Sequence, residues 1–162
     1  MRAESRRGFT LIEMVVVLAI LGVLAAAARP LLELQSRRHK ETELRQALRQ
    51  IRGAIDAYER AVASGAIPRP PDAPASGPVY PRSLRVLADG VAVSDDPDAP
   101  RRYFLRRVPR DPFADRSLRP EDGWALRSSD SPPDAPRAGR DVFDVASRSP
   151  GTALDGTVYR EW

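Results

Sequence analysis

The apolar residues of the chain are concentrated near its amino terminus. Met1–Gly8 is short and carries three arginines, and Phe9–Ala28 is a 20-residue apolar run in which Thr10 and Glu13 are the only polar side chains. A helix of 20 residues covers about 30 Å, which is the thickness of the hydrocarbon core of a bilayer. The pattern therefore predicts a membrane-spanning helix, and the arginines before it favour a cytoplasmic amino terminus.

A second helical pattern follows Pro30. Apolar residues recur there at alternating spacings of three and four, which places them on one face of a helix. They are Leu44, Leu48, Ile51, Ile55, Tyr58 and Val62. We predict one helix over 9–63, with Pro30 as a place where it bends or locally melts, because proline lacks an N–H. A coiled coil is the alternative, but the pattern lasts under three heptads, so packing against the chain's own C-terminal part is favoured.

The rest of the chain, 64–162, is polar and rich in proline and turns. The pattern predicts a short helix from Leu84 through Ala88, an extended segment over Arg102–Val108, and strands over Trp124–Ser128 and Val142–Ser147. Tyr103, Phe104, Phe113 and Trp124 are predicted to lie in the core. The fold class is α+β, with a long helix packed on a small antiparallel sheet. The predicted organisation is a leader (1–8), a transmembrane and amphipathic helix (9–63) and a C-terminal globular domain (64–162).

Composition excludes several kinds of chemistry. The chain has no cysteine, so disulfides, thiolate metal sites and a cysteine nucleophile are excluded. The single histidine, His39, stands among charged helical residues without a catalytic partner nearby. The formal net charge of +4 is spread over alternating Arg and Asp residues, and no basic block is interleaved with aromatic residues. We therefore expect neither an enzyme nor a nucleic-acid-binding protein.

Glu13 is the unusual residue of the apolar run. A carboxylate near the middle of a membrane span costs about 2.5–3.5 kcal/mol on insertion scales, and less near an end. Cleavage before Phe9 would create an α-amino group four residues from Glu13. Unit charges 4 Å apart attract by about 4 kcal/mol at an effective dielectric constant near 20, before any cost of desolvation. We hypothesise that the amine of one subunit neutralises Glu13 of the next subunit in a stack.

Two other interpretations fit the same residues. Ser5–Leu11 partly matches a twin-arginine export signal, and Ala26–Ala28 offers a signal-peptidase site, which would release an exported protein that starts at Arg29. Glu13 inside the apolar region argues against this. The other alternative is an uncleaved anchor with a single span.

The segment Gly8-Phe9-Thr10-Leu11-Ile12-Glu13, with its basic leader and apolar tail, resembles the class III signal of type IV pilins and type II secretion pseudopilins. The resemblance implies that a prepilin peptidase recognises Gly8, Phe9 and Glu13, cuts after Gly8 and methylates Phe9. It also implies a pilin-like fold, an assembly role for Glu13 and a structural, non-catalytic subunit.

Further segments resemble the major pseudopilin of type II secretion. They are Tyr80–Leu87, Tyr103–Phe113, Asp141–Ser147 and the terminal Trp162. The resemblance implies a single-pass protein of the bacterial inner membrane with its C-terminal domain in the periplasm. Its expected partners are copies of itself in a pseudopilus, other pseudopilins, prepilin peptidase and the inner-membrane secretion platform. The alternatives are a minor pilin or type IV pilin of another filament system, including one that binds DNA, and an exported soluble protein.

Members of that group hold calcium in a C-terminal loop, and the resemblance implies a calcium site here. Calcium takes six to eight oxygen ligands, several of them carboxylates. This chain has Ser149–Leu154 where the family has an acid-rich loop, and Asp155 is the remaining acidic candidate, aided by oxygens near Ser147. The competing interpretation is an acidic turn without a metal.

Overall fold

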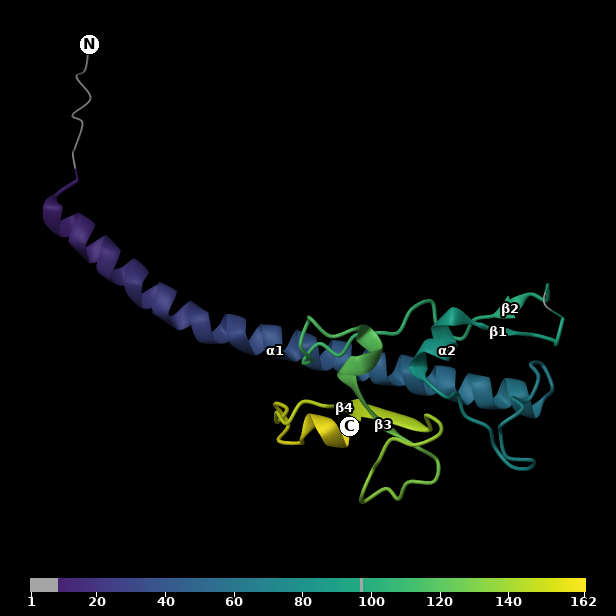
Figure 1. Cartoon of the computed structure of the whole chain (residues 1–162). Coiled ribbons are helices and arrows are strands. Elements are labelled where there is room, and N and C mark those ends of the chain that lie inside the picture. The colour runs from purple at the N-terminus through teal and green to yellow at the C-terminus, as the bar shows by residue number, and fades with distance from the viewer. Residues whose placement is uncertain (1–8, 97) are drawn as a thin grey trace, which may run out of the picture. The chain divides into compact units, whose positions relative to one another are not determined.

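The computed structural model describes residues 9–96 and 98–162, without the side chains of residues 26–31. It divides into two compact units, residues 1–39 and 40–162, and each is described by itself. The helix α1, Leu11–Ala63, contributes to both units (Figure 1). The predicted long helix is therefore confirmed, and the helical backbone continues through residue 30.

Gly65 marks the end of α1. Its φ of 72° lies in the left-handed region that favours glycine, and the N–H of Ala66 donates to the carbonyl of Ala61. This geometry satisfies a carbonyl that would otherwise lack a partner at the end of the helix. The helix end predicted at residue 63 is therefore confirmed.

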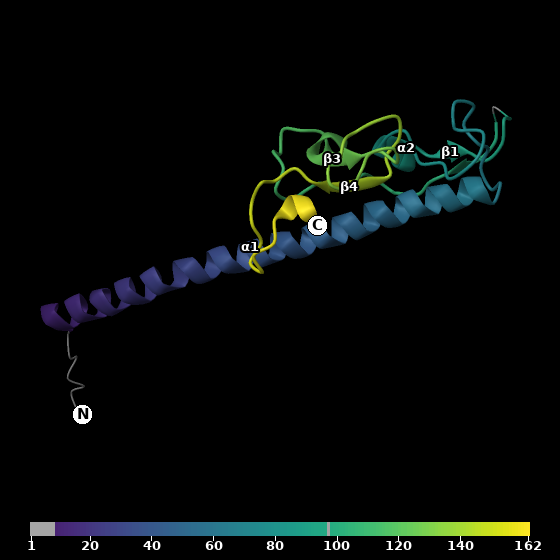
Figure 2. The same cartoon turned by 90° about the horizontal axis from the view of Figure 1, so that it is seen from below.

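The second unit adds short elements to the last half of α1. In chain order these are α2 (Leu84–Asp89), β1 (Val91–Ala92), β2 (Arg101–Arg102), the 3₁₀ turn η1 (Pro120–Gly123), β3 (Trp124–Arg127), β4 (Asp144–Ser147) and the 3₁₀ turn η2 (Tyr159–Glu161). β1 pairs with β2 and β3 pairs with β4, both antiparallel, so two separate two-stranded sheets form. Figure 2 shows α2, β1, β3 and β4 on one side of the second half of α1.

The core of the second unit is built on the apolar face of α1. All six residues of the predicted apolar stripe, from Leu44 to Val62, are buried. Trp124 from β3 is also fully buried, and its indole N–H donates to the Pro109 carbonyl at 2.9 Å. This arrangement confirms that the stripe packs against the chain's own C-terminal part.

The segment after β2 differs from its prediction. The extended segment expected over Arg102–Val108 belongs to a strand only at Arg102. Beyond it, the backbone N–H groups of Phe104 and Leu105 both donate to the carbonyl of Leu87. Tyr103 was expected in the core, but its side chain is 62% exposed. Its ring lies against Gly90, where an added Cβ would come within 2.8 Å of it, and Gly90 has a φ of 77°.

Candidate functional site

The first candidate site is the start of α1. Gly8 lies outside the described residues, and Phe9 is 71% exposed. Thr10 caps the helix, since its hydroxyl oxygen accepts the backbone N–H of Glu13 at 3.2 Å. The backbone carbonyl of Thr10 accepts the N–H of Met14, also at 3.2 Å. Phe9 therefore stands immediately before the N-cap, where cleavage would create a free amine.

Thr10 and Glu13 have the Thr-x-x-Glu spacing of a capping box. This local signal was overlooked in the sequence, where Glu13 was considered only as a buried acid. Glu13 lies in the first turn of α1, where the helix dipole favours a negative charge. A positive amine at Phe9 would be unfavourable next to that dipole, so it would need an anionic partner.

The apolar side chains that follow Glu13 are exposed within this chain. Ile20, Leu21, Val23 and Leu24 are each more than half exposed. Within the described residues, no helix has an apolar stretch long enough to cross a membrane. Contiguous exposed apolar side chains of this kind mark a surface that contacts a membrane or other protein chains.

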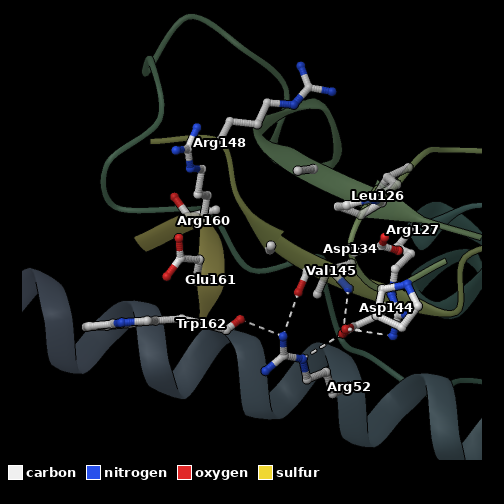
Figure 3. A pocket seen from close by; sticks show the side chains of 15 residues that line it. Arg52, Leu126, Arg127, Asp134, Asp144, Val145, Arg148, Arg160, Glu161 and Trp162 are labelled. Carbon is white, nitrogen blue, oxygen red and sulfur yellow. Dashed lines mark hydrogen bonds and ion pairs between the residues drawn. The ribbon is translucent and has the colours of Figure 1, made fainter. Parts of the chain in front are cut away.

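The second candidate site joins α1 to the C-terminal segment through Arg52. Its guanidinium donates to the Asp144 carboxylate at 2.7 Å and to the carbonyl oxygens of Val145 and Trp162 at 2.9 and 2.6 Å (Figure 3). Arg127 adds a second cation, 3.5 Å from the other oxygen of Asp144. These groups line a hollow of about 1030 Å³. The fork geometry of arginine suits such convergent acceptors, so Arg52 fastens both β4 and Trp162 to the helix.

Glu41 and Arg45 extend this polar contact along α1. The buried carboxylate of Glu41 accepts the Leu154 N–H at 2.9 Å and the Tyr159 hydroxyl at 3.0 Å. Arg45 pairs with Asp155 at 3.1 Å and lies 4.0 Å from the centre of the Trp162 ring. Positions 41, 45 and 52 share one side of a helix, next to the apolar stripe. No local pattern in the sequence indicated that these positions bind residues 144–162.

The structure gives the two calcium candidates different partners. One oxygen of Asp155 accepts the N–H and hydroxyl of Thr157 at 3.0 and 2.6 Å, and the other pairs with Arg45. The hydrogen bonds from Thr157 hold the pKa of the Asp155 carboxyl below its usual range, and Arg45 contributes in the same direction. Ser147 is fully buried, and its hydroxyl donates to Asp111 at 2.6 Å.

Calcium at Asp155 stays a prediction. In the described part of the chain, no three His, Cys, Asp or Glu residues are grouped so that they could hold a metal ion. A calcium ion bound by Asp155 would compete with the Arg45 guanidinium for the same carboxylate. Backbone carbonyls would have to supply most of its remaining ligands.

Comparison with known proteins identifies the amino-terminal segment. Residues 5–28 match the family model of the prokaryotic N-terminal methylation motif. The match indicates a type IV pilin-like protein that prepilin peptidase processes, with a membrane-anchored amino terminus and a structural role in a filament of similar subunits. No curated protein and no solved structure matches the chain.

Loss of the Arg52 fork should destabilise the second unit. We expect Arg52→Ala to lower the free energy of unfolding by about 1–2 kcal/mol, because three acceptors lose a charged donor at a partly exposed position. Arg49→Ala, at an exposed position one turn earlier, is the matched control and should change stability by less than about 0.5 kcal/mol. Urea unfolding of a 29–162 fragment measures both. Equal effects of the two substitutions would contradict the assigned role of Arg52.

The calcium prediction is tested by thermal unfolding of the same fragment. If Asp155 is a ligand, millimolar calcium should raise the melting temperature, because a ligand that binds the folded state stabilises it. Asp155→Asn should abolish that rise, and magnesium at equal concentration controls for ionic strength. An unchanged melting temperature in the unsubstituted fragment would remove the site.

Proposed function

We propose that the chain is a pseudopilin subunit of a type II secretion system. The observation that carries the proposal is the position of the methylation motif at the start of a long helix. The motif covers residues 5–28, and α1 continues to Ala63 with its last turns buried in a small α+β domain. The segments that resemble the major pseudopilin, Tyr80–Leu87 and Tyr103–Phe113 among them, support type II secretion over other filament systems.

The exposed apolar side chains of the first unit need two successive environments under this proposal. Before assembly, lipid covers them, and the subunit is anchored in the inner membrane with its C-terminal domain in the periplasm. During assembly, the corresponding helices of neighbouring subunits replace the lipid. Both environments are apolar, so the transfer from lipid to the filament adds little hydrophobic free energy. The packing of side chains and the pairing of polar groups therefore decide whether the subunits associate.

Glu13 supplies such a polar pair. Once the leader is removed, the amine at Phe9 carries a positive charge beside the N-cap of α1. In the filament, the Glu13 carboxylate of a neighbouring subunit neutralises that amine. The pair is formed away from water, so the loss of either partner leaves an unpaired charge in an apolar setting.

The unbroken backbone of α1 argues against release of an exported protein. Cleavage after Ala28 would cut within a helix that runs from Leu11 to Ala63. It would also discard the capped first turn and leave Arg29 and Pro30 at the new end. A cut before Phe9 leaves the whole helix intact.

Glu13→Ala should separate anchoring from assembly. We expect normal recovery of the variant in the membrane fraction, because the substitution removes a charge from an apolar segment. The sheared filament fraction should fall at least about tenfold, because the amine loses its partner. Immunoblots of both fractions from a strain that supplies the prepilin peptidase measure the two quantities.

Thr10→Ala is the control that separates pairing from helix capping. It removes the hydroxyl that accepts the Glu13 N–H and leaves the carboxylate in place. We expect it to cost about 1 kcal/mol of helix stability and to leave filament yield within about twofold of the unsubstituted chain. Normal assembly of Glu13→Ala would refute the role of Glu13.

A deletion strain distinguishes type II secretion from other filament systems. Loss of the chain should trap the exported enzymes of the secretion system in the periplasm and leave pilus-dependent twitching and DNA uptake unchanged. The proposal requires that the cloned chain restores secretion. Normal secretion with lost twitching would instead assign the subunit to a type IV pilus.

A further inference from the structure

A basic groove lies between α1 and the segment that follows β2. It is bounded by the stretch of α1 from Lys40 to Gln50 and by residues 104–120, and it encloses about 1100 Å³. Its cationic side chains are Lys40, Arg106, Arg107, Arg110 and Arg116, and its acidic ones are Glu43 and Asp111. The groove lies entirely within the second unit.

The groove carries five cationic side chains and two acidic ones, so its own charge is positive. Asp111 is buried, and its carboxylate is occupied by the Ser147 hydroxyl and the Phe113 N–H. Arg106 and Arg107 are exposed, and neither forms an ion pair with any residue that the structure describes. The groove therefore presents exposed guanidinium groups that suit carboxylates.

The complementary charge lies on the turn that joins β1 to β2. Asp95, Asp96 and Asp98 are exposed there. The hydrogen bonds of this turn are local: the Asp98 N–H donates to the Asp96 carboxylate, and the Asp96 N–H donates to the Ser94 hydroxyl. Across residues 9–96 and 98–162, none of the three aspartates forms an ion pair.

The acidic turn and the basic groove lie beside different parts of α1. In both Figure 1 and Figure 2, the β1–β2 hairpin lies beside the last turns of the helix. The groove meets α1 no later than Gln50, and the rise of a helix from Gln50 to Ala63 is about 20 Å. The turn is therefore displaced along the helix from the groove of its own chain.

We propose that the acidic turn of one subunit, through Asp95, Asp96 and Asp98, binds the basic groove of the next copy of this chain. The contact joins two different surfaces, so it is heterologous, and repeated along parallel helices it generates an open filament. It rests on the proposed filament function, and it adds a contact between the C-terminal domains to the one between the amino-terminal helices. The complementary charges favour one offset between neighbouring subunits along the filament and disfavour other offsets.

Disulfide crosslinking tests the contact in the full chain. The chain has no cysteine, so a pair such as Asp96→Cys with Arg107→Cys reports on one contact alone. We expect oxidised filaments of the double variant to give a ladder of covalent multimers, and each single variant to give none. Asp130→Cys with Arg107→Cys is the matched control, because Asp130 is an exposed aspartate on another loop.

Charge reversal gives an independent measurement. Asp95→Lys/Asp96→Lys and Arg106→Glu/Arg107→Glu should each reduce the sheared filament fraction by about fivefold or more, since like charges then face each other. The four substitutions combined should restore it. Asp130→Lys/Asp134→Lys, which makes the same change of charge elsewhere, should leave the yield unchanged.

The outcomes separate this inference from the proposed function. Filaments that assemble normally after either reversal, without crosslinks in the cysteine pair, overturn the contact and leave the filament function intact. Absence of filaments from the unsubstituted chain overturns both. If the arginine reversal instead releases the chain from membranes and no crosslink forms, anionic lipid occupies the groove and the contact is wrong.

Discussion

The apolar face of α1 between Leu44 and Val62 is the interaction on which the C-terminal domain depends. The longest strands have four residues and each sheet has two strands, so neither sheet could form a stable core alone. The helix supplies the missing layer, and Trp124 from β3 is buried in the same core. Beside the apolar face, Glu41 and Arg52 bind residues 144–162 through a buried carboxylate and a three-way fork. One helix therefore provides both the core and the polar attachment of the chain's last segment.

At the start of the same helix, the apolar side chains are exposed instead of buried. The local order there comes from a capped first turn at Thr10 and Glu13. Exposed apolar surface of this kind is typical of sites that contact lipid or other subunits. The methylation motif at residues 5–28 identifies the processing event that precedes assembly. Under the proposed function, the first half of α1 joins subunits and the second half holds the surface domain.

Periodicity predicted the parts of the structure that are governed by burial. The stripe from Leu44 to Val62 repeats often enough to define a helix face, and Ser64-Gly65 marks its end with a residue suited to a positive φ. The strands at Trp124–Arg127 and Asp144–Ser147 were also found, because their patterns are bounded by turns. The conformation of the segment after Arg102 was not predicted correctly. Its backbone N–H groups donate to the carbonyl of Leu87 instead of to a neighbouring strand.

The polar contacts of the candidate sites were harder to predict. Arg52 and Asp144 are separated by 92 positions, and no local pattern distinguishes an arginine that binds a distant carbonyl from one that faces water. The cap at Thr10 is different, because the Thr-x-x-Glu spacing of Thr10 and Glu13 is visible in the sequence. The same residue, Glu13, carries a membrane cost as a carboxylate and donates its backbone N–H to the cap.

Under the proposed function, the mature chain begins at Phe9, and its helix α1, Leu11–Ala63, stays whole. The most direct measurement is amino-terminal sequencing and intact mass of the chain extracted from membranes that contain prepilin peptidase. We expect a chain that lacks Met1–Gly8 and starts with N-methylphenylalanine at Phe9. A mature chain that starts at Arg29, or one that retains Met1–Gly8 in the presence of active peptidase, would contradict it.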